Sequence, residues 1–191
     1  MTHACTDPHH HVHDAPSFVA AVERACRDRG LRLTPIRARV LGLVARQGKP
    51  IKAYDLLEQL RLDNARIEKV RAEKTRGEKA GTGKSRAGSA NDEDSAGAAA
   101  PPTVYRALDF LLANGFIHKL ESVNAFVACH HPNTAQHSVP FLICDRCHSA
   151  VELEDRQVVA ALDERARALG FVPQAQTLEV HGICARCVES G

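Results

Sequence analysis

The sequence has few aromatic residues, almost no net charge and no long apolar run at its start. Aromatic side chains make up 4% of the 191 residues, so we expect cores built from small aliphatic side chains. The formal net charge of +2 neither requires nor excludes nucleic acid as a partner, because local clustering of charge matters more than the sum. Without an apolar run near the start we expect no signal peptide and no membrane insertion. The expected location is the cytoplasm.

The sequence also lacks an open three-ligand zinc motif such as His-Glu-x-x-His, which disfavours a metallohydrolase. We therefore expect neither an enzyme nor a small organic substrate. Cysteine and histidine are abundant instead, with seven and eleven copies. In a reducing cytoplasm, Cys-x-x-Cys pairs more often bind metal or carry redox chemistry than form structural disulfides.

The strongest single motif is a pair of Cys-x-x-Cys sequences, Cys144 with Cys147 and Cys184 with Cys187. Four thiolates suit a closed, tetrahedral zinc site with Zn–S distances of ~2.3 Å. The alternative is a thiol redox switch, in which Cys144 and Cys147 form a disulfide and release zinc. We favour structural zinc, because a redox site needs one pair and this chain has two.

A second candidate zinc set combines nitrogen, sulfur and oxygen donors, and it consists of His118, Cys129, His137 and Glu152. A thiolate favours zinc over Mn²⁺ or Mg²⁺. Each residue alone is a weak signal, because a single His or Glu is usually solvated and Cys129 could belong to a core. Three nearby histidines could replace one of these ligands: His130, His131 and His148.

Apolar spacing predicts helices in the N-terminal part of the chain. The first covers residues 17–29 with Ser17 as its cap, and the second begins at Pro35 with Thr34 as its N-cap. The third covers residues 53–62 and the fourth residues 102–114. Two strands, residues 116–122 and 124–129, follow. This order of helices and a hairpin is that of a winged helix-turn-helix.

Two stretches have compositions typical of disorder. Residues 1–16 are rich in histidine and lack periodicity, so we expect a disordered tail that could bind metal loosely. The insert at about residues 63–100 is poor in apolar residues, begins basic and turns acidic. Such a segment buries too little surface to offset its ordering entropy. Ile67 and Val70 could extend the preceding helix by a few turns.

The C-terminal part has the pattern of a small α/β unit. A polar connector at residues 130–136 is a candidate hinge. Short strands are expected on both sides of the first cysteine pair, and a further strand over residues 171–184. Between them, residues 155–169 form a predicted helix, whose inward residues are expected to be Val158, Val159, Leu162 and Ala166.

The outward face of the helix at residues 102–114 is a candidate DNA-reading surface. Arg106 could bind a guanine edge through two hydrogen bonds, and Tyr105 could contact a thymine methyl group or a phosphate. The alternative is an ordinary solvated helix face. The full set of candidate DNA contacts is Tyr105, Arg106, Thr103, Tyr54, Arg37 and Lys52.

These motifs resemble the ferric uptake regulator family, and within it the branch of zinc-responsive repressors. The resemblance rests on RLTPIRARVL, AYDLL, PPTVYRALDFLLANGFIHKLES, FLICDRC and HGICARC, and it covers about residues 17–188 apart from the insert. It implies an α+β protein with an N-terminal winged helix (17–129) and a C-terminal α/β dimerisation domain (137–191). It also implies a homodimer that binds a palindromic, AT-rich DNA operator and controls zinc uptake genes.

The resemblance assigns two zinc ions to each protomer. The structural zinc falls on the four cysteines, and the regulatory zinc on the set that includes His118 and Cys129. Cys129 separates this branch from relatives that sense iron or peroxide, although an iron-, manganese- or nickel-responsive regulator remains the alternative within the family. The sequence departs from the family pattern in its insert and at His148, where glycine is common.

Overall fold

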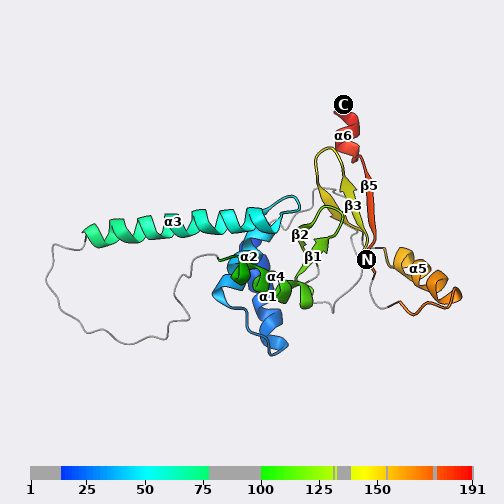
Figure 1. The fold of residues 1–191 in the computed structure, drawn as a ribbon, viewed down its shortest axis with the longest axis horizontal. Coiled ribbons are helices and arrows are strands. Elements are labelled where there is room, and N and C mark those ends of the chain that lie inside the picture. Colours follow the sequence, from blue (N-terminus) through cyan, green and yellow to red (C-terminus); the bar gives the residue numbers. More distant parts are fainter. Residues whose placement is uncertain are drawn as a thin grey trace.

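The structure is a computed structural model that describes residues 14–77, 100–130, 132, 139–153, 155–173 and 176–190. Four helices and a hairpin form one part, and a three-stranded sheet with two helices forms the other (Figure 1). The elements are α1 (Ala15–Asp28), α2 (Pro35–Arg46), α3 (Ala53–Gly77), α4 (Pro101–Ala113), β1 (Ile117–Leu120), β2 (Ala125–Ala128), β3 (Phe141–Cys144), β4 (Ala150–Glu152), α5 (Arg156–Ala168), β5 (Glu179–Gly182) and α6 (Ala185–Glu189).

The N-terminal part, α1–α4 with β1 and β2, has an aliphatic core as expected. Its fully buried side chains come from every helix and include Val22, Val40, Leu56, Leu60, Leu108 and Leu111. Proline begins both α2 and α4, where its missing N–H costs no helical hydrogen bond. The expected cap of α1 was wrong: the helix begins at Ala15 after Asp14, and the Ser17 hydroxyl hydrogen-bonds to the Asp14 carboxylate.

The hairpin confirms the predicted wing. Strands β1 and β2 pair antiparallel, with Ile117 opposite Ala128. Ile51, just before α3, adds a bridge to Phe126 through two backbone hydrogen bonds of 2.8 and 3.0 Å. The hairpin is thereby fixed to the helices, and the winged helix-turn-helix is complete.

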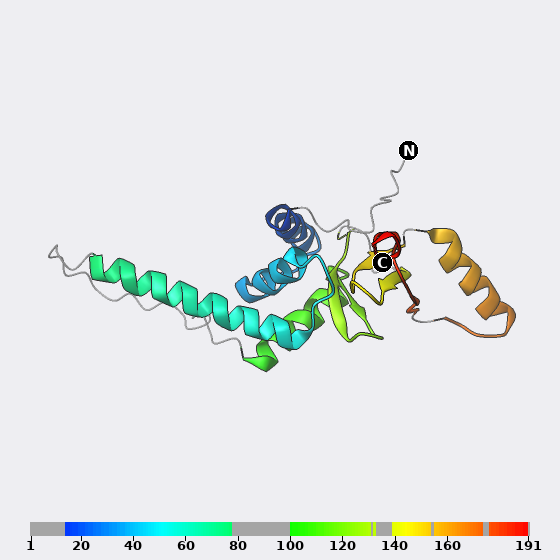
Figure 2. The same ribbon diagram turned by 90° about the horizontal axis from the view of Figure 1, so that it is seen from above.

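Helix α3 continues into the insert, as the positions of Ile67 and Val70 allowed, so the first residues of the insert are helical although the insert as a whole has the composition of a disordered segment. It runs for 25 residues to Gly77 and extends well away from the body of the protein (Figures 1 and 2). Good helix formers such as Arg66, Glu68 and Lys69 continue the backbone hydrogen bonds without a buried face. Ile67 and Val70 are exposed on this extension. The rest of the insert, the N-terminal tail up to residue 13 and most of the candidate hinge lie outside the described residues.

The C-terminal part is a sheet in the order β4-β3-β5, in which β3 is antiparallel to β4 and parallel to β5. The predicted strand over residues 171–184 is only Glu179–Gly182, because β5 can pair only along the four residues of β3. The short helix α6 was not predicted. Asp155 caps α5, and its carboxylate accepts a hydrogen bond of 2.8 Å from the N–H of Gln157.

The inward face predicted for α5 is not buried. None of its residues is buried, and Val159 and Leu162 only border a small hollow shared with Val139, Pro140 and Leu178. The apolar periodicity correctly predicted an amphipathic helix, but it does not identify the surface that covers the apolar face. Within the described ranges, no helix is long and apolar enough to cross a membrane.

Candidate metal centres and nucleic-acid interface

The four-cysteine cluster forms where β3 and β5 end side by side. Cys144 ends β3 opposite Gly182 of β5, so the turn after β3 and the start of α6 meet. The four sulfur atoms all lie within 4.8 Å of one another, and those of Cys147 and Cys184 are 3.8 Å apart. Sulfurs at ~2.3 Å from a tetrahedral zinc are ~3.8 Å apart, whereas a disulfide requires about 2.05 Å. The cluster therefore fits a zinc ion.

Hydrogen bonding and burial shift the pKa values of three of these thiols, those of Cys144, Cys147 and Cys187, in different directions. The Ser149 hydroxyl, 3.1 Å from the sulfur of Cys147, is the main cause that lowers the pKa of Cys147 to about 6. The backbone N–H of Cys147 lowers the pKa of Cys144. Burial raises the pKa of Cys187 to about 12. Without metal, the cluster therefore keeps some of its thiol protons. Binding of a divalent cation would favour the release of these remaining protons.

Sequence reasoning missed Ser149. It is buried directly beside the first cysteine pair, and its backbone carbonyl accepts a hydrogen bond of 2.9 Å from the N–H of Cys144. Its position two residues after Cys147 was the available signal, because a hydroxyl in the same turn can reach the sulfur.

A second cluster joins the two parts of the protein. His118 lies on β1, Cys129 follows β2, and Glu152 ends β4; one ligand atom from each lies within 4.8 Å of the others. Nε2 of His118 is 4.0 Å from a carboxylate oxygen of Glu152, and their side chains are 15% and 2% exposed. The ring of Phe141 packs against the imidazole at a centroid distance of 5.2 Å. The backbone N–H of His130 donates to the same carboxylate at 3.4 Å.

This donor set fits zinc in type and nearly in spacing. Nitrogen and oxygen ligands at ~2.0–2.2 Å from a tetrahedral zinc lie ~3.4 Å apart, so the His118 and Glu152 ligand atoms, 4.0 Å apart here, would approach by about 0.6 Å. A buried carboxylate and a buried thiol also form a site where a cation offsets a desolvation cost. The fourth predicted ligand, His137, lies outside the described residues, as does His131. In the described part of the chain, neither His130 nor His148 joins either cluster.

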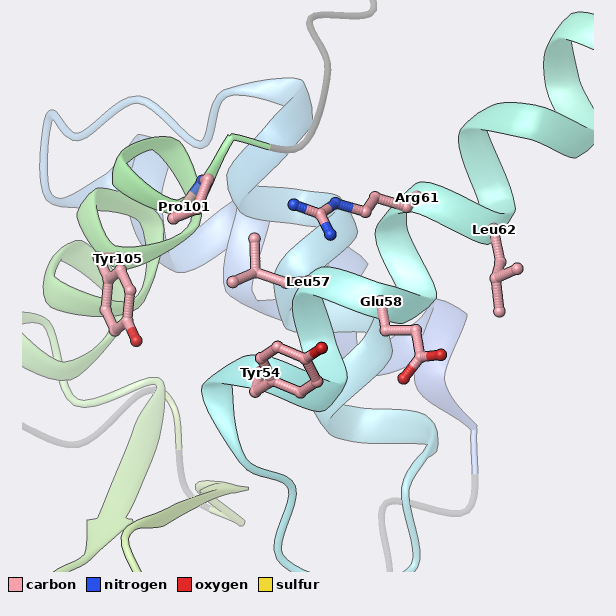
Figure 3. A pocket seen from close by; sticks show the side chains of 7 residues that line it. All are labelled: Tyr54, Leu57, Glu58, Arg61, Leu62, Pro101 and Tyr105. Atoms are coloured by element: carbon pink, nitrogen blue, oxygen red, sulfur yellow. The ribbon is translucent and has the colours of Figure 1, made fainter.

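The candidate DNA-reading surface lies on α4 and the start of α3. Thr103, Tyr105 and Arg106 are exposed on α4, and Lys52 and Tyr54 are exposed at the start of α3. The two tyrosines border a hollow of about 560 Å³. Figure 3 shows Leu57 above the ring of Tyr54 and the guanidinium of Arg61 directed toward Pro101. Sequence reasoning missed Arg61, which adds positive charge to this surface.

Arg37 differs from the other candidate DNA contacts. It is half-buried, and its guanidinium stacks over the ring of Phe110 with 3.6 Å between the guanidinium carbon and the ring centroid. It also donates a hydrogen bond of 2.7 Å to the backbone carbonyl of Arg32. Arg37 therefore has a structural role in the fold besides the predicted phosphate contact.

A winged helix joined to an α/β domain by a shared cluster of metal-ligand side chains defines the class of metal-dependent winged-helix proteins. No family model matches the sequence. The zinc uptake regulation protein of Escherichia coli (strain K12) is 37% identical over 172 residues, which cover 90% of this chain and 82% of that protein. The chain therefore belongs to the ferric uptake regulator family, in its zinc uptake regulator branch.

Two solved structures resemble the chain over nearly its whole length. Holo XcZur is 63% identical with a TM-score of 0.69, covering 91% of this chain and 98% of that one. A zinc uptake regulator complexed with zinc and DNA is 36% identical with a TM-score of 0.69, covering 92% of this chain and 96% of that one. Both support the winged-helix and α/β arrangement described above.

Proposed function

We propose that this protein is a zinc-responsive transcriptional repressor, which binds operator DNA as a zinc-loaded homodimer and controls zinc uptake genes in the cytoplasm. The observation that carries the proposal is the cluster between the two parts of the chain. Its three described donors come from the wing and from the α/β domain, yet their ligand atoms lie within 4.8 Å of one another. The relatives named for zinc uptake regulation, one of them complexed with zinc and DNA, support the same function.

The proposal assigns two zinc ions to each protomer. The structural ion is held by the four cysteines of the first cluster, Cys144, Cys147, Cys184 and Cys187. Because metal binding and folding are coupled, this closed site stabilises a small α/β domain that has few buried residues. The regulatory ion is held by His118, Cys129 and Glu152. The fourth ligand in the proposal is His137, which was predicted from the sequence and lies outside the described residues. Zinc held by these residues would supply a positive charge between the two domains, and its regulatory role would need no open coordination position for catalysis.

The regulatory site couples metal binding to the relative orientation of the two domains. His118 and Cys129 move with the wing, whereas Glu152 moves with the sheet of the α/β domain. The donors can meet around one ion only in an orientation close to the one observed. If operator DNA selects the same orientation, zinc and DNA must tighten each other's binding by the same factor, with a typical coupling of ~1–3 kcal/mol.

Exposed apolar residues in the α/β domain support the homodimer. Phe171 and Val172 are 70% and 84% exposed, and Val180, Ile183 and Val188 are exposed as well. Among the described residues, β5 has a strand on one side only. An open strand edge beside exposed apolar side chains is a surface that another chain usually covers. A second copy of this chain is the partner that the proposal places there.

The winged helix supplies the DNA contacts. We assign Tyr105, Arg106 and Thr103 of α4 to the major groove, with Arg106 as the residue that reads a guanine edge. Tyr54, Lys52 and Arg37 contact phosphates in the same proposal. The exposure of the first five is compatible with this role.

The alternative metals are disfavoured by the buried thiol of Cys129, because sites for iron or manganese in proteins more often use only nitrogen and oxygen donors. The experiment is operator binding by fluorescence anisotropy in zinc, iron(II), manganese(II) and nickel(II), with a scrambled duplex as control. Zinc should tighten operator binding most. Tighter binding with iron, manganese or nickel than with zinc would reject zinc as the corepressor.

The redox switch has its own support, because a thiol with a pKa of about 6, such as that of Cys147, is largely thiolate at neutral pH and therefore reactive. Treatment with mild peroxide at excess zinc separates the two functions. A structural zinc should be retained together with operator binding, whereas a redox switch would release zinc and lose the operator.

A further inference from the structure

A second contact, made by residues that are not metal-ligand candidates, fastens the wing to the α/β domain. Glu179, the first residue of β5, reaches the turn that follows β1 in the wing. One carboxylate oxygen accepts the backbone N–H of Glu121 at 2.6 Å, and the other accepts the backbone N–H of Ser122 at 3.0 Å. The Ser122 hydroxyl also bonds to this second oxygen. Three donors of the wing thus converge on one carboxylate.

The same strand adds a second side chain to this contact. His181 lies two residues after Glu179, so both side chains point to the same face of β5. Its Nε2 is 2.9 Å from the Ser122 hydroxyl oxygen, and its Nδ1 is 2.8 Å from a carboxylate oxygen of Asp145. Asp145 therefore orients the imidazole toward the wing.

The Ser122–His181–Asp145 connectivity is also that of a hydrolase triad, but its surroundings argue against catalysis. An acyl-transfer site needs backbone N–H groups free to stabilise an oxyanion. Here the N–H groups of Glu121 and Ser122 are both bonded to the Glu179 carboxylate. The negative charge of Glu179 already lies where the negative charge of an oxyanion would have to develop. The network is therefore suited to holding the wing in place and not to hydrolysis.

The Glu179 carboxylate is well suited to such a contact. Burial acts to raise its pKa, but the hydrogen bonds from Ser122 and Glu121, together with the nearby His181, outweigh burial and lower it. The group is therefore ionised at neutral pH, and hydrogen bonds to an ionised acceptor are stronger than those between neutral groups.

Sheet register links this contact to the proposed regulatory site. Phe141 of β3 pairs with Glu179 of β5 on one side and with Glu152 of β4 on the other. Residues directly paired across strands share a face of the sheet. The Phe141 ring packs against the imidazole of His118, so it lies between the carboxylate that holds the wing turn and the carboxylate of the metal-ligand cluster.

We infer that Glu179, assisted by His181, is a positioning residue that clamps the wing in the orientation that gathers the regulatory zinc ligands. This inference rests on the proposed function, because it assumes that His118, Cys129 and Glu152 bind the regulatory ion. The clamp favours that orientation before zinc arrives, so part of the cost of bringing the domains together is already offset. Loss of the clamp should weaken zinc binding at the regulatory site and leave the four-cysteine site unchanged.

The test compares Glu179→Gln with Glu121→Gln in the full-length protein that retains its structural zinc. Glu121 is a matched control, since its carboxylate pairs with Lys119 at 2.6 Å within the wing and does not connect the domains. Zinc affinity of the regulatory site is measured without DNA by competition with a chelator. We expect Glu179→Gln to weaken it about fivefold or more, the lower end of typical coupling between sites, and Glu121→Gln to change it less than about twofold.

Two further variants separate a positioning role from a general loss of structure. Ser122→Ala removes one donor from the wing side, so its effect and that of Glu179→Gln should be non-additive in the double variant. The melting temperature and the structural zinc content should stay at parental values. Parental zinc affinity in Glu179→Gln, or additive effects in the double variant, would overturn the clamp. Parental affinity in Cys129→Ser would instead show that the proposed regulatory site is wrong.

Discussion

Nε2 of His118 lies 4.0 Å from a carboxylate oxygen of Glu152, although His118 belongs to the wing and Glu152 to the sheet of the α/β domain. Along the chain, the two residues are linked only through the connector between β2 and β3. Their separation therefore reports the relative orientation of the two domains. A ligand that holds both must change the population of that orientation, which is the physical basis of the predictions that concern zinc.

Cys129→Ser should abolish zinc-dependent operator binding without unfolding the protein. The hydroxyl keeps the approximate volume of the buried side chain but is a much poorer zinc ligand than a thiolate. The backbone N–H of Cys129 still donates to the carbonyl of Phe116 at 3.1 Å, so β2 should keep its place. Fluorescence anisotropy with operator DNA, and zinc content per protomer, provide the measurements.

Cys144→Ser is the matched comparison, because the same substitution falls in the other cluster. Here we expect loss of the structural zinc and a destabilised α/β domain, since metal binding and folding are coupled in such small sites. Circular dichroism and thermal unfolding distinguish the two outcomes. If both variants were equally folded and equally unable to bind the operator, the division into structural and regulatory sites would be wrong.

Arg106→Ala should weaken specific operator binding by about 1–3 kcal/mol and leave zinc affinity unchanged. Arg106 is exposed on α4, and it lies on the face opposite the buried Val104 and Leu108. Lys52→Ala is the comparison for a phosphate contact: it should weaken specific and nonspecific binding alike and lower the salt dependence. An Arg106→Ala variant that still discriminates between operator and scrambled DNA would remove Arg106 from base reading.

The sequence was sufficient for features that depend on short spacing. The four cysteines occupy two local motifs, and the sheet needs only to bring their ends together. Helix and strand order followed from apolar periodicity, and proline marked the starts of α2 and α4. The set that includes His118, Cys129 and Glu152 had weak local signals, and the family resemblance supplied what spacing could not.

Features that depend on register or on another surface could not be predicted. The contact of Glu179 with the wing turn requires the parallel pairing of β3 with β5 and a particular orientation of two domains. The inward face of α5 was predicted from Leu162 and its neighbours, but a periodic pattern does not identify the surface that covers it. The extension of α3 was allowed by Ile67 and Val70, but both side chains are exposed, so the helix reaches Gly77 on helix-forming residues and not on a buried face.

Zinc binding to the four-cysteine site should release more protons per ion at pH 5.5 than at pH 7.5. The pKa of Cys147 is lowered to about 6 by the Ser149 hydroxyl, so this thiol is mostly ionised at pH 7.5 and mostly protonated at pH 5.5. Cys187, with its pKa raised to about 12 by burial, carries a proton at both pH values. Calorimetric titration in buffers of different ionisation enthalpy measures the number released.

The same shifts predict how pH affects the metal-free protein. The lowered pKa of Cys147 contributes stability that is fully present above 9.0 and is lost as pH falls through about 6. The raised pKa of Cys187 contributes stability that is fully present below 9.0 and is lost as pH rises toward about 12. Ser149→Ala is the control: it should raise the pKa of Cys147 and move the change in proton release to higher pH. An unchanged profile in this variant would remove Ser149 as the cause.

His148→Gly should stabilise the zinc-loaded α/β domain by about 0.5–1 kcal/mol. His148 has a φ of 58° in the turn after the first cysteine pair, and its N–H donates to the Cys144 carbonyl at 2.8 Å. A side chain with a Cβ costs roughly 1–2 kcal/mol in this left-handed conformation, and the greater freedom of glycine in the unfolded chain cancels only part of the gain. Urea denaturation with detection of released zinc measures the difference.

Two substitutions distinguish backbone strain from loss of the imidazole. His148→Ala removes the imidazole but keeps the Cβ, so it should give no comparable gain. Asn124→Gly tests the other non-glycine residue with positive φ in the described chain, at 48°. Asparagine tolerates this conformation better than most residues, so its replacement should stabilise less than that of His148. If His148→Ala stabilised as much as His148→Gly, the imidazole itself would be the unfavourable group, and the strained backbone would not explain the family's preference for glycine at this turn.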